Sequence, residues 1–201
     1  MKVHQYEYIL RLAIFFLMSA GFLISGTFRK KANASGGDEI SFKDEGRFIH
    51  MFRSLFALAG YGGILIYLVY PPALAWAQLD LPGAIRWAGI AVMLVMLPLL
   101  YWMFSHLGNN ITPTVITREG HSLVTSGPYR WIRHPLYTFG FINFFGLSLA
   151  AGNWFIFLML ALAMVTLGFR TKIEERQLLE KFGQQYQSYA NTTGRFLPKL
   201  R

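Results

Sequence analysis

Two groups of ionisable residues flank a long apolar segment of the chain. Residues 126–137 carry two Arg, one His and two Tyr, and Arg170, Glu174 and Glu175 follow a stretch of 33 residues (137–169) without a charged side chain. Ionisable groups beside hydrocarbon are costly and usually belong to a functional site. Arginine can orient an anion and histidine can transfer a proton, while carboxylates can bind an amine or ribose hydroxyls. Brought together, these groups suit a ligand with an amino-acid portion.

The composition predicts an all-α, polytopic integral membrane protein. Hydrophobic residues make up 54% of the 201 residues and charged residues only 14%, which is more apolar than a soluble domain of this size requires. Three segments, residues 9–28, 55–77 and 87–104, are each long enough to cross about 30 Å of hydrocarbon as a helix. The basic run at residues 29–31 follows the first segment directly, which favours a membrane anchor over a cleaved signal peptide.

The fourth apolar segment predicts a helical hairpin. Residues 137–169 are too long for one upright span, and Ala150-Ala151-Gly152-Asn153 lies near their middle. A hairpin over residues 136–170 gives five transmembrane helices in total. It also places its two ends side by side on one membrane surface, so that the two ionisable groups meet.

The distribution of basic residues predicts the orientation of the chain in the membrane. With five spans, 16 of the 19 Lys and Arg lie on the side of the C-terminus, in residues 29–53, 106–136 and 170–201. Because cytoplasmic loops carry an excess of Lys and Arg, we expect the N-terminus outside, the C-terminus in the cytoplasm and the active site facing the cytoplasm.

The chain is expected to divide into two parts. Residues 1–105 contain the first three spans and a cytosolic loop near residues 29–46. Residues 106–201 form the catalytic region, which comprises a cytosolic loop, the hairpin and a cytosolic, cofactor-binding C-terminal region with a helix. Helix-forming residues follow Ile173 without a breaker until Gly183, so the last span is expected to continue into water.

Several other functions find no support in the sequence. The net charge of +9 comes mostly from the basic residues on the predicted cytoplasmic side of the membrane. No base-stacking motif accompanies these scattered residues, so no nucleic-acid partner is expected. The chain has no Cys, which excludes disulfides and cysteine-based chemistry. Its five His, at positions 4, 50, 106, 121 and 134, lack ligand spacing on one helix, so no metal site is expected. The oligomeric state is not indicated.

The C-terminal half resembles a known enzyme family. Residues 123–137 read Leu-Val-Thr-Ser-Gly-Pro-Tyr-Arg-Trp-Ile-Arg-His-Pro-Leu-Tyr, and Glu174-Glu175, residues 182–189 and residues 195–198 follow in order. This series is similar to the isoprenylcysteine carboxyl methyltransferases, which are integral membrane enzymes related to phospholipid methyltransferases. The resemblance covers roughly residues 100–200.

The resemblance implies a cytosol-facing pocket for S-adenosylmethionine, with S-adenosylhomocysteine as the product, and an opening through which a lipophilic or prenylated acceptor arrives from the membrane lipids. The positions that match the family's cofactor pocket are His121, Leu123, Val124, Tyr129, His134, Pro135, Tyr137 and Glu174. Arg170 and Glu175 match the positions at the acceptor end and are the expected catalytic residues.

The chemistry of the acceptor stays open. A carboxylate is ionised at neutral pH and needs no base, whereas an amine or a thiol must lose a proton, for which Glu175 or His134 is a candidate base. An isoprenylcysteine-like carboxylate is the expected acceptor, and a phospholipid or a small thiol is the alternative. An NADPH-dependent reductase of the sterol reductase type and a non-enzymatic membrane assembly factor are the other candidate functions.

Overall fold

The computed structural model describes residues 2–34, 47–108 and 122–199. The described chain consists of helices α1 (Lys2–Ala34), α2 (Arg47–Val69), η2 (Pro71–Ala77), α3 (Gly83–Leu107), η4 (Gly127–Arg130), α4 (Pro135–Ala151) and α5 (Trp154–Thr192). Two isolated bridges, and no β-strand, accompany them in these residues. The predicted all-helical fold is confirmed.

Four of the helices are long and apolar enough to cross a membrane. They are Gln5–Ala34, His50–Val69, Gly83–Leu107 and Trp154–Thr192. Helix α4 is apolar but has 17 residues, which is short for a span on its own. The five-span arrangement therefore stays a prediction.

Helix α2 ends earlier than the apolar pattern predicted. We expected a span over residues 55–77, but α2 stops at Val69 and residues 71–77 form the 3₁₀ helix η2. The reason is the pair Pro71-Pro72, because proline lacks an amide donor and restricts the residue before it.

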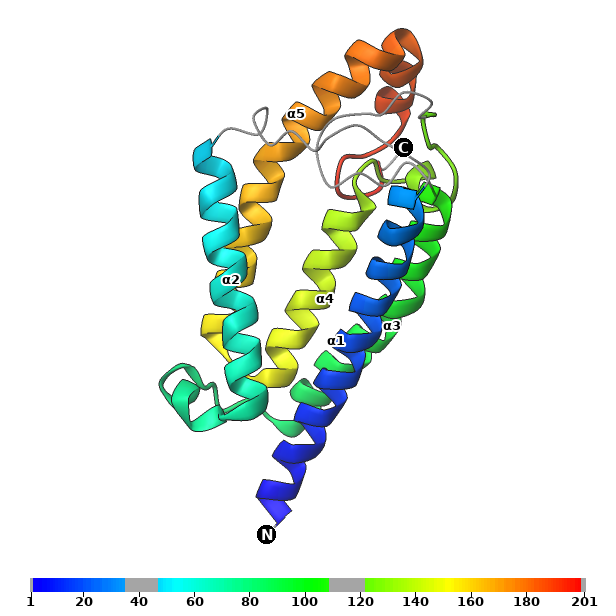
Figure 1. The fold of residues 1–201 in the computed structure, drawn as a ribbon. Helices are drawn as coiled ribbons and strands as arrows, with labels where there is room; N and C mark the ends of the chain where they lie inside the picture. The colour runs from blue at the N-terminus through cyan, green and yellow to red at the C-terminus, as the bar shows by residue number, and fades with distance from the viewer. Residues whose placement is uncertain (1, 35–46, 109–121, 200–201) are drawn as a thin grey trace.

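The long helices run along one another in a bundle, and α4 lies between α1, α2 and α5 in the view of Figure 1. Helices α3 and α4 pack closely: a Cβ added to Gly89 would lie 2.4 Å from the carbonyl oxygen of Gly146. Only glycine permits this approach of the two backbones. A buried cluster that includes Leu10, Met93 and Leu147 joins α1, α3 and α4.

A buried arginine ties the helices together at the end of the bundle that holds the α4–α5 turn. The Arg86 guanidinium donates to both carboxylate oxygens of Glu7, to the Tyr67 hydroxyl at 3.0 Å and to the Ala150 carbonyl at 2.9 Å. These contacts join α1, α2, α3 and α4. Because a buried charge is tolerated when it is paired and hydrogen-bonded, this cluster is a structural anchor.

Helices α4 and α5 are joined by Gly152 and Asn153. Gly152 has a φ of 61°, and Asn153 begins α5 by accepting a hydrogen bond from the Ile156 amide at 3.1 Å. The tight turn lets α5 run back along α4 (Figure 1). At its far end, α5 is interrupted at Gly183, where φ is 51°, and the chain turns back toward the beginning of α4.

Candidate functional site

The segment before α4 is held in an irregular path by its glycine and prolines. Gly127 has a φ of 58°, and a Cβ there would lie 2.5 Å from the His106 ring. Pro128 and Tyr129 are buried in the short helix η4. Burial raises the pKa of the Tyr129 phenol, which therefore stays neutral at physiological pH. This packing fixes the backbone up to His134.

The C-terminal segment pairs with the backbone at the beginning of α4. The amides of Arg133 and His134 donate to the carbonyls of Gly194 at 2.9 Å and Arg195 at 3.0 Å. Thr138 Oγ1 donates to the Phe196 carbonyl at 2.7 Å. These bonds pair the backbone at the beginning of α4 with the C-terminal segment, because the kink at Gly183 returns the chain to this point.

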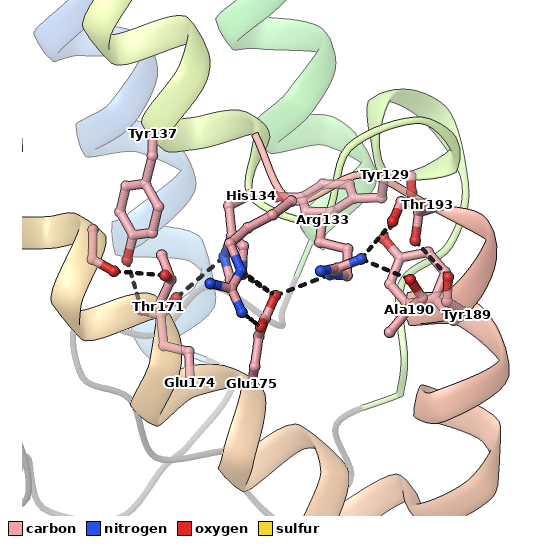
Figure 2. A network of polar contacts seen from close by, with 12 residues as sticks. Tyr129, Arg133, His134, Tyr137, Thr171, Glu174, Glu175, Tyr189, Ala190 and Thr193 are labelled. Atoms are coloured by element: carbon pink, nitrogen blue, oxygen red, sulfur yellow. Dashed lines mark hydrogen bonds and ion pairs between the residues drawn. The ribbon is translucent and has the colours of Figure 1, made fainter. Parts of the chain in front are cut away.

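Glu174 is a junction between α4 and α5 (Figure 2). Its carboxylate accepts hydrogen bonds from the Tyr137 hydroxyl at 2.6 Å and from Arg170 Nε at 2.8 Å, and lies 3.4 Å from His134 Nδ1. The His134 and Tyr137 rings stack with their centroids 5.6 Å apart. Arg170 and Glu174, one helical turn apart on α5, thus form an ion pair that faces the residues that begin α4.

Glu175 gathers three cationic side chains (Figure 2). Its carboxylate accepts from Arg133 Nε at 2.9 Å and from Arg195 Nε at 3.1 Å, and lies 3.2 Å from His134 Nε2. Arg133 also donates to the carbonyls of Ala190 and Thr193. Glu175 therefore connects α5, the beginning of α4 and the C-terminal segment.

His134 bridges the two carboxylates. Burial alone would lower its pKa, but hydrogen bonds to Glu174 and Glu175 and the charges of these carboxylates outweigh burial and raise it above the ordinary value. The raised pKa favours the protonated ring, which lies between the two carboxylates.

This bridge predicts a pH-dependent stability. Because the folded-state pKa of His134 is raised, its stabilising contribution is fully present below the unfolded pKa of about 6.5 and is lost as pH rises through the folded value. Thermal unfolding of detergent-purified protein should show His134→Gln less stable than wild type near about pH 6. We expect the stability difference to narrow as pH rises through the raised folded-state pKa of His134, and a difference that does not change with pH would contradict the bridge.

A cavity of about 480 Å³ opens beside these residues. Its polar part includes Tyr129, His134, Tyr137, Arg170 and Glu174. Its apolar part is lined by side chains of α1, α4 and α5, among them Leu17, Met18, Phe144, Met164 and Leu167. The cavity thus joins a charged pocket to an apolar pocket between helices.

Most of the residues expected from the sequence line this cavity. They are Leu123, Val124, Tyr129, His134, Pro135, Tyr137, Arg170 and Glu174. His121 lies outside the described residues. Glu175 is not among the lining residues, and its three cationic partners favour a role in positioning. The catalytic role expected for Glu175 stays a prediction, and its contacts with Arg133, His134 and Arg195 do not favour that role.

Several polar residues of this region were not predicted from the sequence. Arg29 of α1, Tyr61 of α2, and Tyr186 and Tyr189 of α5 also line the cavity. The two tyrosines of α5 lay within the motif that carried the family resemblance, which was a usable signal. Arg29 was read only as part of the basic run after the first span, and nothing in its spacing points to the site. In the described residues, no group of His, Asp and Glu is arranged to hold a metal ion.

Comparison with known proteins identifies the family. The family model of the phospholipid methyltransferases matches residues 84–185. The chain is 30% identical over 121 residues to the cobalt-zinc-cadmium resistance protein CzcN of Cupriavidus metallidurans, which covers 59% of this chain and 56% of that protein. It is 30% identical over 73 residues to the methanethiol S-methyltransferase of Pseudomonas deceptionensis, covering 36% of this chain and 27% of that one.

A solved structure shares the fold. The eukaryotic intramembrane Ras methyltransferase ICMT (isoprenylcysteine carboxyl methyltransferase) superposes with a TM-score of 0.52 and 28% identity, over 72% of this chain and 51% of that one. The matches thus span about half, or less, of each of these relatives. They confirm the resemblance seen in the sequence. Since the family model covers half of the residues, including the beginning of α4 and both glutamates, the chain belongs to the phospholipid methyltransferase family of membrane proteins.

Proposed function

We propose that this protein is an integral membrane methyltransferase that transfers a methyl group from S-adenosylmethionine to a lipophilic acceptor. The observation that carries the proposal is the single cavity that joins the polar residues around Glu174 to an apolar pocket among α1, α4 and α5. The family match and the ICMT-like fold support the same activity.

The residues present fit such a cofactor. Glu174 and Tyr137 offer an acceptor and a hydroxyl beside the cavity. The Tyr186 hydroxyl is buried, has no hydrogen-bond partner among the described residues, and belongs to a residue that lines the cavity. A buried polar group without a partner is costly, and a ligand with carboxylate or ribose oxygens would satisfy it. Leu123, Val124 and Pro135 would supply the apolar walls.

When bound, S-adenosylmethionine would supply an electrophilic methyl group on a sulfonium. An acceptor carboxylate is already ionised at neutral pH, so no residue of the site would need to remove a proton from it. Arg170 would orient the carboxylate through its guanidinium, and the apolar pocket would exclude water. The main task of the site is alignment of the reacting atoms.

The proposed acceptor is an isoprenylcysteine-like carboxylate that enters from the lipid phase. A small thiol is the second candidate, because a methanethiol S-methyltransferase is among the relatives. With five spans, the excess of Lys and Arg would place the C-terminus and the site at the cytoplasmic face and the N-terminus outside.

Binding and transfer assays test this proposal. Calorimetry on detergent-purified protein should show binding of S-adenosylhomocysteine and not of NADPH. Transfer from radiolabelled donor should be measured in parallel to a prenylcysteine analogue, a phosphatidylethanolamine and methanethiol. Binding of NADPH alone would favour a reductase, and binding of neither NADPH nor S-adenosylhomocysteine would favour an assembly factor. Either result would contradict the methyltransferase proposal.

A further inference from the structure

An arginine on α1 lines the cavity together with the polar residues of α4 and α5. Arg29 lines the cavity, and its Nε donates to Ser25 Oγ one turn earlier at 3.1 Å. An arginine near the end of a spanning helix commonly extends toward water. Arg29 instead lines the cavity together with Arg170, Tyr137 and Tyr61, which belong to three other helices. Its guanidinium is therefore directed into the bundle.

Two guanidinium groups, those of Arg29 and Arg170, belong to residues that line the same cavity. Arg170 is paired with Glu174 at 2.8 Å. Arg29 forms no ion pair with any carboxylate in the part of the chain that the structure describes. Two guanidinium groups of like charge repel each other in a poorly solvated cavity, and an anion between them would remove this repulsion.

The apolar residues that line the cavity indicate that such an anion would also have an apolar chain. On the same face of α1 as Arg29, about two and three turns further from the polar end, Phe22, Gly21 and Met18 line the cavity. Met164 and Leu167 line it from α5, on the turns before Arg170. A ligand with its anionic group near Arg29 and Arg170 would therefore extend an apolar chain between α1 and α5.

We infer that Arg29 is a specificity-determining residue which, together with Arg170, binds the carboxylate of an amphipathic acid in the apolar part of the cavity. The inference rests on the proposed function and narrows its acceptor to an anion. A cationic amine headgroup would be repelled by the two arginines, and an uncharged thiol would offer no anionic partner to the Arg29 guanidinium. Acceptor selection then depends on α1, outside the residues 84–185 that match the family model.

Equilibrium binding without cofactor tests this inference independently of catalysis. The probes are N-acetyl-S-farnesylcysteine, its carboxamide and farnesylamine, which share one apolar tail and differ in charge. We expect wild type to bind the acid at least about tenfold more tightly than the carboxamide, as one charge-assisted pair of hydrogen bonds would provide. Arg29→Gln should abolish this preference, and Arg29→Lys should retain part of it.

Lys30→Gln is the matched control, because it removes the same charge from the adjacent, exposed position that does not line the cavity. It should bind all three probes like wild type. The inference is overturned if wild type binds the carboxamide or the amine as tightly as the acid, if Arg29→Gln keeps the preference, or if Arg29→Gln weakens S-adenosylhomocysteine binding more than acid binding. If acid selectivity holds while no methyl transfer occurs, the proposed function fails and the acid site stands.

Discussion

Replacing Arg170 with alanine should lower kcat for methyl transfer by about a hundredfold while changing the affinity for S-adenosylhomocysteine by less than about threefold. Arg170 lies where the polar and apolar parts of the cavity meet, so its guanidinium is placed to orient the acceptor. Glu174 keeps its contacts with Tyr137 and His134 when Arg170 is absent. Single-turnover assays with radiolabelled donor, together with calorimetry, separate the two effects.

Glu174→Ala is the reciprocal variant. Glu174 faces His134 and Tyr137, the residues proposed to hold the cofactor. Its removal should weaken S-adenosylhomocysteine binding by about tenfold or more, since charge-assisted hydrogen bonds are worth roughly 1.5 to 3 kcal/mol.

Arg170→Lys retains the positive charge but loses the planar guanidinium, which can form two parallel hydrogen bonds to a carboxylate. The kcat of this variant should lie between those of wild type and Arg170→Ala. Equal losses of affinity and turnover in the Arg170→Ala and Glu174→Ala variants would contradict this division of roles.

Replacing Glu175 with glutamine should destabilise the folded protein by about 3 kcal/mol. The side chains of Glu175, Arg133 and His134 are 14%, 13% and 7% exposed, so the neutral variant removes the carboxylate that pairs with Arg133 and one of the two that pair with His134. The C-terminal segment should loosen as well, because Arg195 loses its carboxylate partner. Thermal unfolding in detergent, followed by tryptophan fluorescence, measures the change.

Glu180→Gln provides the control for this substitution. Glu180 lies on the same helix but is exposed, so the same change of residue there should alter stability by less than about 0.5 kcal/mol. The Glu175 variant also distinguishes two roles for this residue. If Glu175→Gln keeps wild-type stability and cofactor affinity but loses turnover, the catalytic role expected from the sequence is correct and the positioning role is wrong.

Local sequence predicted the positions of the helices better than their ends. The apolar segments at residues 9–28 and 87–104 lie within α1 and α3, because apolar length and the scarcity of charges are properties of the segment itself. The predicted span over residues 55–77 extended too far at its C-terminal end. The residues stay apolar through Pro71-Pro72, but the backbone cannot continue there as an α-helix. Gly152-Asn153 was visible as a break, and it separates α4 from α5.

The site was predicted where residue type and spacing were unusual. His134, Tyr137, Arg170 and Glu174 are polar groups beside apolar segments, and the structure brings them together along one cavity. Arg29 is also a charged residue beside an apolar segment. Its position in the basic run at residues 29–31 is typical of the end of a membrane span, so the sequence did not indicate a role in the site. Its direction into the bundle depends on how α1 packs against α4 and α5, which no local pattern encodes.

The amino-acid sequence alone therefore established the class of the protein, its helical segments and the residues that carry the family resemblance, since these follow from local composition and motif. Tertiary structure decided the partners of each charge. Glu175 meets Arg195 because α5 kinks at Gly183 and returns the C-terminal segment to His134. Such contacts join residues tens of positions apart, and their geometry depends on the packing of whole helices.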